Sequence, residues 1–338
     1  MPSVPTVPSV TSVTSTPPVP SVPAAPPARV PRHTLIQFSD VHLVDGGELP
    51  HGGVDTHANL ESAARAVVDS RTAVAGLLLT GDLADSGSPV AYRRLRAVVE
   101  PLARHLGAPV IYAMGNHDER TAFRRELLGA APTTDGLSTI PCDSVHWIAG
   151  LRIVVLDSTT PGYDSGHLTD DQLVWLRDEL ARPAPDGTVL VLHHPPVPSP
   201  MLVVELMTLR EPDRLARVVA GSDVRIILSG HAHHASCGLL AGIPVWVSPA
   251  TAFGADLLSP AGRARALRTA ACSRIDIYPD TVVASVVTLA PAETLFDNDE
   301  SDMARHIDQA AIQAATQAAD RNPAAGRTPT GQGRAACS

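Results

Sequence analysis

Residues 224–234, VRIILSGHAHH, join an apolar, β-branched run to a glycine and three histidines. The run predicts a short strand that is followed at once by a polar loop. The three imidazoles, at His231, His233 and His234, are candidate metal ligands. Because a histidine cluster alone does not establish a metal site, the pattern carries weight only if other strands end in the same way.

Six more runs of this kind lie along the chain, and segments with helical patterns lie between them. Short strands that alternate with helices are typical of an α/β fold. A hairpin with a Pro-Asp turn follows the last of these runs, over residues 274–289. The six runs are residues 34–38, 75–80, 109–114, 151–156, 188–192 and 244–248.

Two of the helical segments begin with recognisable N-terminal capping signals. Ser88 precedes Pro89, which is the pattern of an N-cap followed by proline at the first helical position. Thr169 and Gln172 predict a capping box, and the leucines that follow, at positions 173, 176 and 180, recur at helical spacing. The second helix is therefore expected to lay one apolar face on a sheet.

The two ends of the chain differ from its middle in composition. Residues 1–33 consist mainly of proline, serine, valine and threonine without a period, which predicts a disordered tail and lacks the features of a secretory signal. Residues 296–338 predict an Ala-rich helix followed by a second loose tail. The middle, residues 34–295, is long enough for one large α/β domain.

Charge and cysteine spacing exclude several classes of function. The net charge is −9 and all 26 basic residues are arginines, which are interspersed with acidic residues, so we expect no nucleic-acid-binding face. No apolar run reaches the length of a membrane span. The four cysteines lie far apart without CxxC spacing, which favours reduced thiols in a cytoplasmic protein.

The polar residues that follow the predicted strands form a recurring pattern. In open α/β sheets ligands bind at the carboxyl ends of the strands, so one site could collect side chains from several strand ends. Glycine precedes several of these side chains and permits close backbone approach. The side chains are Asp40, His42, Asp82, Asp85, Asn116, His117, Asp118, Asp157, His193, His194, His231 and His233.

The mixture of side chains indicates which chemistry such a site supports. Carboxylate, imidazole and amide oxygen without thiolate suit manganese, iron or zinc better than calcium. A carboxylate can bridge two ions about 3.5–4 Å apart, and such a pair activates water and stabilises the attacking and leaving oxygens of a phosphoryl displacement. The pattern therefore favours hydrolysis of a phosphate ester at two metal ions.

Five blocks in this order resemble the signature of the calcineurin-like metallophosphoesterases. The blocks are Asp40-x-His42, Gly81-Asp82-x-x-Asp85, Gly115-Asn116-His117-Asp118, His193-x-Pro195 and Gly230-His231-x-His233. Three wider stretches, residues 81–96, 183–199 and 242–251, resemble the class III 3′,5′-cyclic-nucleotide phosphodiesterases of the actinobacterial type. The resemblance covers residues 33–295 and leaves most of both tails uncovered.

The resemblance implies a fold and two sets of metal ligands. The expected fold is a four-layer α-β-β-α sandwich, in which two mixed β-sheets pack face to face with helices outside. One ion would be held by Asp40, His42, Asp82 and His233. The other would be held by Asp82, Asn116, His193 and His231, with Asp82 bridging the two.

Further roles follow from the same resemblance. His117 would be the catalytic residue, which orients the phosphate or protonates the leaving 3′-oxygen, and Asn116 would also face the substrate. Asp85 would hydrogen-bond to a ligand and fix its orientation. His194 and Asp118 would support the ligands from behind.

The implied activity is hydrolysis of the 3′,5′-cyclic nucleotides cAMP and cGMP to 5′-nucleoside monophosphates by a metal-bridging hydroxide. Iron or manganese would fill the two sites, with zinc, magnesium or cobalt as alternatives. The expected partner is the small-molecule substrate, without nucleic acid or a membrane span, and a homodimer stays open.

Two other functions remain as alternatives. One is the same chemistry on another small phosphodiester, such as a 2′,3′-cyclic nucleotide or a glycerophosphodiester, or on a nucleotide-linked pyrophosphate. The other is a non-catalytic scaffold on the same fold. The scaffold is disfavoured because all seven matched ligand positions carry a ligand-competent side chain.

The three histidines of the opening stretch can now be told apart. His231 and His233 lie two positions apart, and in extended chain such residues face the same side. Both are therefore expected to reach one site. His234 would face the opposite side and take no part.

Overall fold

The computed structural model describes residues 29–46, 49, 53–130, 139–289 and 297–307, together with the isolated positions 309 and 313. The chain divides into two units. One unit spans Arg29–Ala292, and the other consists of the terminal stretches Met1–Ala28 and Glu293–Ser338. All the candidate site residues belong to the first unit.

One mixed sheet has five strands in the order β13-β12-β1-β2-β3. The strands β1, β2 and β3 pair in parallel, and β12 and β13 extend the sheet antiparallel. Leu35 sets the register, since it pairs with Gly76 on one side and with Ile275 on the other. The strands are β1 (His33–Phe38), β2 (Gly76–Thr80), β3 (Val110–Ala113), β12 (Ala271–Ile277) and β13 (Val282–Thr288).

The second mixed sheet has six strands in the order β4-β5-β6-β7-β9-β8. Its four central strands are parallel, and β4 and β8 pair antiparallel at the two edges. The strands are β4 (Ser144–Ile148), β5 (Leu151–Leu156), β6 (Thr188–Leu192), β7 (Val224–Ser229), β8 (Ser236–Leu240) and β9 (Ile243–Val247). A separate two-stranded ribbon joins β10 (Gly254–Ala255) and β11 (Ala266–Leu267).

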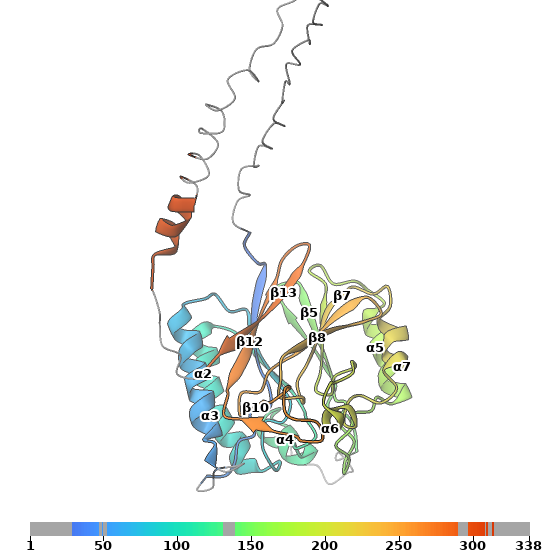
Figure 1. Cartoon of the computed structure of the whole chain (residues 1–338). Helices are drawn as coiled ribbons and strands as arrows, with labels where there is room; N and C mark the ends of the chain where they lie inside the picture. Colours follow the sequence, from blue (N-terminus) through green and yellow to red (C-terminus); the bar gives the residue numbers. More distant parts are fainter. Residues whose placement is uncertain are drawn as a thin grey trace, which may run out of the picture. The chain divides into compact units, whose positions relative to one another are not determined.

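Helices cover the outer face of each sheet (Figure 1). The helices α2 (Thr56–Ser70), α3 (Pro89–Leu106) and α4 (Arg120–Glu126) pack on the five-stranded sheet. The helices α5 (Asp170–Leu180) and α7 (Pro212–Val219) pack on the six-stranded sheet, and α6 (Leu202–Glu205) is a short additional turn. The predicted four-layer sandwich is therefore confirmed.

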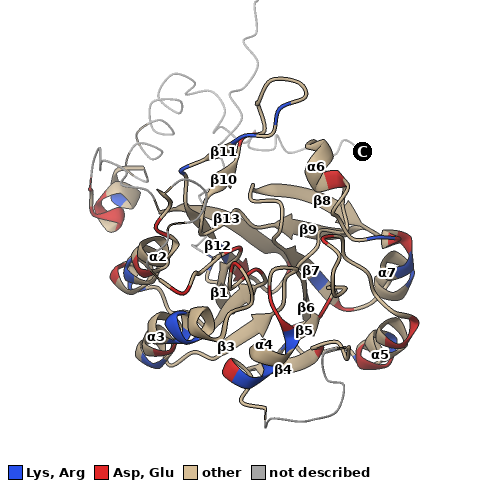
Figure 2. Cartoon of the chain, turned by 90° about the horizontal axis from the view of Figure 1, so that it is seen from below, with Lys and Arg blue, Asp and Glu red and all other residues tan. Residues whose placement is uncertain are grey.

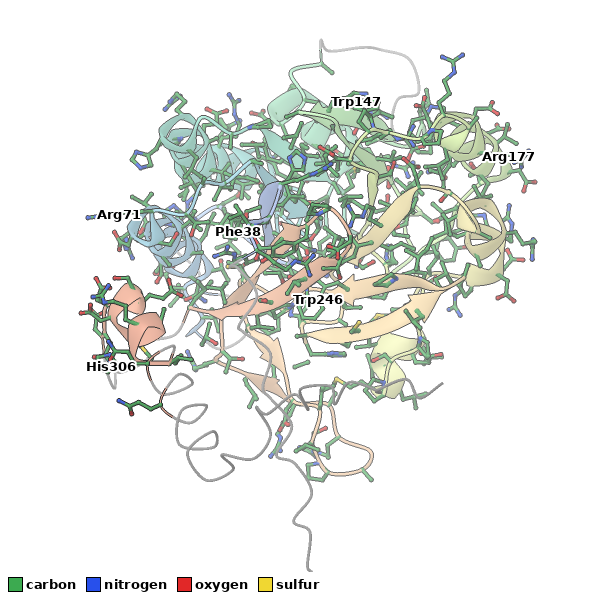
Figure 3. All side chains as sticks on the ribbon, turned by 90° about the horizontal axis from the view of Figure 1, so that it is seen from above. Phe38, Arg71, Trp147, Arg177, Trp246 and His306 are labelled. Carbon is green, nitrogen blue, oxygen red and sulfur yellow. The ribbon has the colours of Figure 1, made fainter. Side chains whose placement is uncertain are left out.

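The layers follow from side-chain alternation along the strands. Leu35 of β1 lies in the apolar cluster between the two sheets, whereas Ile36 lies in the cluster under α2 and α3. Phe38, which is labelled in Figure 3, belongs to the same cluster as Ile36. The same alternation separates Val191 from Leu192 in β6. Because both faces of the central strands are buried, their sequences are continuous apolar runs.

The strand and helix predictions hold with small shifts at the ends. Strands β5 and β6 begin and end where predicted, and β1 begins one residue earlier, at His33. The Ser88 side chain caps α3, and the Thr169–Gln172 capping box opens α5. The strands β4, β8, β10 and β11 were not predicted.

The Ala-rich segment near the C-terminus is described only in part. Residues 300–307 are helical, and much of the remainder of 296–338 lies outside the described residues. Most of the predicted N-terminal tail, up to residue 28, lies outside them as well. Over the part of the chain that the structure describes, no helix has the length and apolar character needed to cross a membrane.

Candidate metal centre

The candidate ligands leave the carboxyl ends of five parallel strands. They follow β1, β2 and β3 of one sheet and β6 and β7 of the other, which are neighbours within each sheet. The carboxyl ends of these strands therefore deliver all seven side chains to one region. In Figure 2, acidic loop segments lie in the middle of the molecule, between the labels of β1 and β7.

The backbone at most of these ligands is left-handed. A positive φ is uncommon outside glycine, and such residues cluster at functional sites where the surrounding structure holds them. Five of the seven candidate ligands have it: Asp40 (φ 50°), His42 (47°), Asp82 (50°), His231 (69°) and His233 (55°). The strand ends turn sharply here, so that consecutive ligands point into the same space.

This backbone corrects one step of the sequence argument. His231 and His233 do not lie in extended chain, because both have positive φ and residues 231–234 form a series of bends. Both nevertheless reach the centre. His234, which was expected to face the opposite side, is buried, and its two ring nitrogens have no hydrogen-bond partner.

Three motif glycines let the loops approach one another. A Cβ on Gly81 would overlap the His193 ring, and a Cβ on Gly115 would overlap the Asp82 carboxylate. A Cβ on Gly230 would overlap Ser39 Oγ and lie 2.7 Å from Asp40 Oδ2. Each glycine is therefore required by the close contact of its backbone with a candidate ligand or the residue beside one.

Asp40, His42 and His233 form the first group of ligand atoms, which lie within 4.8 Å of one another. The Nδ1 atom of His42 faces Asp85 Oδ1 at 3.1 Å, and that of His233 faces the Phe253 carbonyl at 3.0 Å. Both Nδ1 atoms therefore carry a proton, so that each ring in its neutral form has its lone pair on Nε2. These two Nε2 atoms lie only 3.1 Å apart, as expected for two ligands of one cation.

Asp82, His193 and His231 form the second group, also within 4.8 Å. His193 Nδ1 donates to the Thr80 carbonyl at 2.9 Å, so its Nε2 faces the centre, 3.3 Å from Asp82 Oδ2 and 3.2 Å from His231 Nδ1. His231 Nε2 and the amide oxygen of Asn116 are buried without a protein partner. Unpartnered buried polar atoms of this kind are satisfied by a ligand or water.

Asp82, a member of the second group, also faces the first group. Its Oδ2 is 3.7 Å from His42 Nε2 and 3.3 Å from His193 Nε2. Its Oδ1 accepts a hydrogen bond from the His117 backbone at 2.9 Å, which fixes the plane of the carboxylate. The donor set fits two ions that share one carboxylate.

Burial and opposite charge shift the pKa values of these groups. Burial alone would raise the pKa of the Asp82 carboxyl, but His193, through its charge and a hydrogen bond, and the charges of His42 and His117 together hold that pKa well below its ordinary value. Burial lowers the pKa of His193, yet Asp82 raises it to about 9. Burial, aided by a neighbouring histidine, lowers the pKa of both His231 and His233 to about 3. These two rings are therefore neutral and available as ligands at neutral pH.

Comparison with known proteins agrees with this geometry. The family model described as calcineurin-like phosphoesterase matches residues 33–235. The chain belongs to this family. The family and the two histidine–aspartate groups together imply that the protein binds divalent metal ions, and the prediction of a metal-dependent phosphoesterase is confirmed at this level.

Two relatives are similar over most of their length. One, from Rhodococcus erythropolis, is named "Probable cyclic nucleotide phosphodiesterase"; it is 44% identical over 285 residues, covering 84% of this chain and 93% of the relative. The other, from Mycobacterium tuberculosis, is named cAMP/cGMP dual specificity phosphodiesterase; it is 44% identical over 266 residues, covering 78% of this chain and 82% of the relative. Among solved structures, a dimetal phosphatase from Danio rerio has the same fold, with a TM-score of 0.55 at 15% identity, covering 78% of this chain and 100% of that one.

In this member of the calcineurin-like family, Asp118 ties two ligand loops together. Its carboxylate accepts hydrogen bonds from the backbone N–H groups of Leu83, Ala84 and Gly115 and from the Tyr92 hydroxyl, at 2.9–3.2 Å. Leu83 and Ala84 follow Asp82, and Gly115 precedes Asn116. No motif singled out Tyr92, which lies on α3 and reaches this carboxylate only through the tertiary fold.

His194 packs behind the second group of ligands. Its ring centroid is 5.1 Å from that of His193 and 4.8 Å from that of His231. Its Nε2 donates to the Asp164 carbonyl at 3.2 Å, and its Nδ1 accepts from the Ser158 hydroxyl at 2.8 Å. Burial lowers the pKa of His194 well below its ordinary value, so the ring is neutral and both nitrogens are satisfied.

Asp157 is the strand-end carboxylate that the centre does not include. It pairs with the buried guanidinium of Arg120 at 3.0 Å and accepts from the backbone of Cys142 and Thr159. Its oxygens are therefore occupied by a structural network that anchors the start of α4. The expectation that one site collects every strand-end polar residue is wrong for Asp157.

Proposed function

We propose that the chain hydrolyses the 3′,5′-cyclic nucleotides cAMP and cGMP to 5′-nucleoside monophosphates at a centre of two divalent metal ions. The observation that carries the proposal is the pair of histidine–aspartate groups joined through Asp82. The choice of substrate is supported by the 44% identity to two relatives whose names state cyclic nucleotides. The catalytic domain is assigned to residues 34–295.

The ligands are assigned from the two groups of side chains. Asp40, His42 and His233 hold one ion, and Asn116, His193 and His231 hold the other, with Asp82 shared. The orphaned Asn116 oxygen supports its assignment as a ligand. Iron or manganese suits this mixture of imidazole, carboxylate and amide, and zinc, magnesium and cobalt are the alternatives. When bound, the ions supply hydroxide at neutral pH and neutralise negative charge on the phosphate oxygens.

His117 has the position of a proton donor. It is exposed beside the first group, with its ring centroid 4.8 Å from that of His42. Its Nδ1 donates to the Asp85 carbonyl at 2.8 Å, which fixes the ring and leaves Nε2 to face the substrate. A proton on Nε2 then passes to the 3′-oxygen as the phosphorus–oxygen bond breaks.

Asp85 acts on both histidines at once. Its side chain accepts from His42 Nδ1, and its backbone carbonyl accepts from His117 Nδ1. One residue therefore orients both a ligand and the proposed acid. Carboxylates that accept a hydrogen bond from a metal-bound imidazole orient it in the same way.

The test is turnover of cAMP, cGMP, a 2′,3′-cyclic nucleotide and a glycerophosphodiester, with metal analysis of the same sample. We expect kcat/KM for the two 3′,5′-cyclic nucleotides to exceed that for the other esters. Asp82→Ala should lose at least one metal ion and nearly all turnover. His117→Ala should keep its metal and lose about 100-fold or more in kcat. A preference of orders of magnitude for a different ester would overturn the choice of substrate.

A further inference from the structure

Phe253 lies against the first group of ligands. Its ring centroid is 4.5 Å from that of His233 and 5.9 Å from that of His42, with interplanar angles of 54° and 33°. Its backbone carbonyl accepts the hydrogen bond from His233 Nδ1. The carbonyl thus orients a ligand, whereas the side chain is a separate feature that substitution can remove without removing that hydrogen bond.

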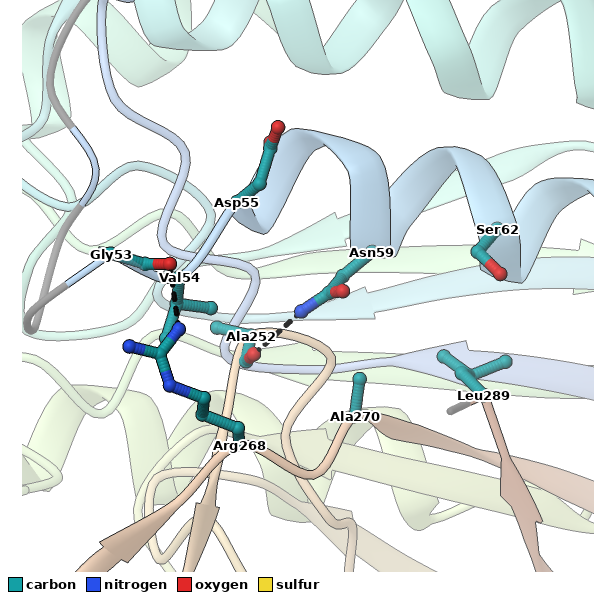
Figure 4. Close-up of a pocket in the computed structure, with 9 residues that line it drawn as sticks. All are labelled: Gly53, Val54, Asp55, Asn59, Ser62, Ala252, Arg268, Ala270 and Leu289. Atoms are coloured by element: carbon teal, nitrogen blue, oxygen red, sulfur yellow. Dashed lines mark hydrogen bonds between the residues drawn. The ribbon is translucent and has the colours of Figure 1, made fainter. Parts of the chain in front are cut away.

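The segment around Phe253 is fixed from both sides. Thr251 N–H donates to the Ser39 carbonyl at 2.8 Å, and Ala252 N–H donates to the Asp40 carbonyl at 3.1 Å. The Ala252 carbonyl accepts from Asn59 Nδ2 at 2.8 Å, and both residues line a cavity of about 240 Å³ (Figure 4). The phenyl ring is therefore presented from a rigid backbone.

The exposure of Phe253 differs from that of the other phenylalanines that the structure describes. Phe38 and Phe123 are fully buried in the core, whereas Phe253 is partly exposed beside the metal centre. Aromatic residues make up only 3% of the chain. A partly exposed aromatic residue whose ring centroid lies 4.5 and 5.9 Å from those of two metal-facing imidazoles is suited to contact a planar group of the substrate.

We propose that the Phe253 ring is the stacking platform for the nucleobase of the substrate. This inference rests on the proposed function, because only a nucleotide whose phosphate lies at the metal centre places a base beside this ring. Aromatic stacking is tolerant of base identity, since every base has a π face. The platform therefore predicts that adenine and guanine are both accepted with little discrimination.

The test compares Phe253→Leu with the unchanged protein on three substrates: cAMP, cGMP and the base-free ribose 3′,5′-cyclic phosphate. Loss of one stacked base corresponds to about a tenfold loss in kcat/KM. We expect this loss for both nucleotides, mainly as a higher KM, and no change for the base-free ester. Metal content should stay the same, and Phe253→Tyr should restore the KM.

A matched control is Tyr163→Leu, which removes an exposed aromatic side chain from the loop that packs on His194. This variant should leave all three substrates unaffected. An equal loss for Phe253→Leu on all three substrates, or a nucleotide-specific loss for Tyr163→Leu instead, would overturn the inference.

A binding measurement separates this inference from the proposed function. Calorimetry should show that the manganese-loaded protein binds 5′-AMP more tightly than ribose 5-phosphate, and that Phe253→Leu abolishes the difference. Failure to hydrolyse cyclic nucleotides would refute the proposed function, while the base-dependent difference in affinity would still decide the role of the ring. Equal affinities for the two ligands in the unchanged protein would refute the platform.

Discussion

Gly230→Ala tests whether close backbone contact sets the metal centre. Gly230 does not have a left-handed φ, so alanine there carries no backbone strain, and its effect comes from the added methyl group alone. The methyl would overlap Ser39 Oγ and lie 2.7 Å from Asp40 Oδ2. The carboxylate cannot retreat freely, because it accepts from the His231 N–H at 2.9 and 3.0 Å.

The expected cost has two measurable parts. Overpacking of this kind costs about 1–3 kcal/mol, which lowers the melting temperature by about 3 to 10 °C for a domain of this size. Displacement of Asp40 should also weaken manganese binding by about 10- to 100-fold, the range seen when the support of a ligand is lost. Thermal unfolding and calorimetric titration measure the two effects separately.

Gly242→Ala is the matched control. Gly242 has φ 82°, and a Cβ added there would meet no atom within 4 Å, so alanine at this position is strained but not crowded. It should lose about 1 kcal/mol of stability and keep its affinity for manganese. Adding Ser39→Ala to Gly230→Ala should recover part of the stability. If Gly230→Ala binds manganese as tightly as the unchanged protein, close contact at this glycine does not position Asp40.

Three further predictions follow from the same contacts. Asp85→Ala should weaken manganese binding about 10- to 100-fold because His42 loses its partner. Asp85→Asn keeps an acceptor and should lose less affinity. Equal affinities of the Asp85→Ala variant and the unchanged protein in a calorimetric titration would contradict this. Burial raises the pKa of Asp143 to about 6. As the pH rises, the folded state therefore keeps this proton after the unfolded state has released it, and the free energy of unfolding falls between about pH 4 and pH 6. In urea unfolding, Asp143→Asn should remove that part of the pH dependence of stability. The raised pKa of His193 means that metal displaces a proton, so manganese affinity should increase from pH 6.5 to pH 8, with proton release visible as a buffer-dependent heat.

The central strands were predictable because they are buried on both faces. In β5 and β6 every residue is buried, and the apolar side chains pack either between the sheets or under the helices, so the apolar run ends where the strand ends. The edge strands β4 and β8 contain His146 and Gly238, and their side chains are partly exposed. Burial on one face leaves a weaker apolar signal, which is why these two strands were missed.

The identities of the candidate ligands were predictable, but their geometry was not. Asp40, Asp82 and His231 could be singled out because each follows an apolar run. The sequence could not show that the backbone is left-handed at these positions, since propensity favours glycine there. Nor could it place Phe253 or Tyr92, because both reach the centre through contacts between segments far apart in the chain.

The left-handed backbone at the ligands is compensated by hydrogen bonds between neighbouring strand ends within each sheet. Each such residue costs about 1 kcal/mol or more, so several in one site require compensation nearby. The loops supply it to each other: Asp40 N–H donates to the Gly81 carbonyl at 3.1 Å, His42 N–H to the Asp82 carbonyl at 2.9 Å, and Gly230 N–H to the His193 carbonyl at 3.0 Å. These bonds link β1 to β2 and β7 to β6 without involving a metal ion. The protein therefore holds the ligand loops in place through its own backbone, and the ions bind to side chains that are already gathered.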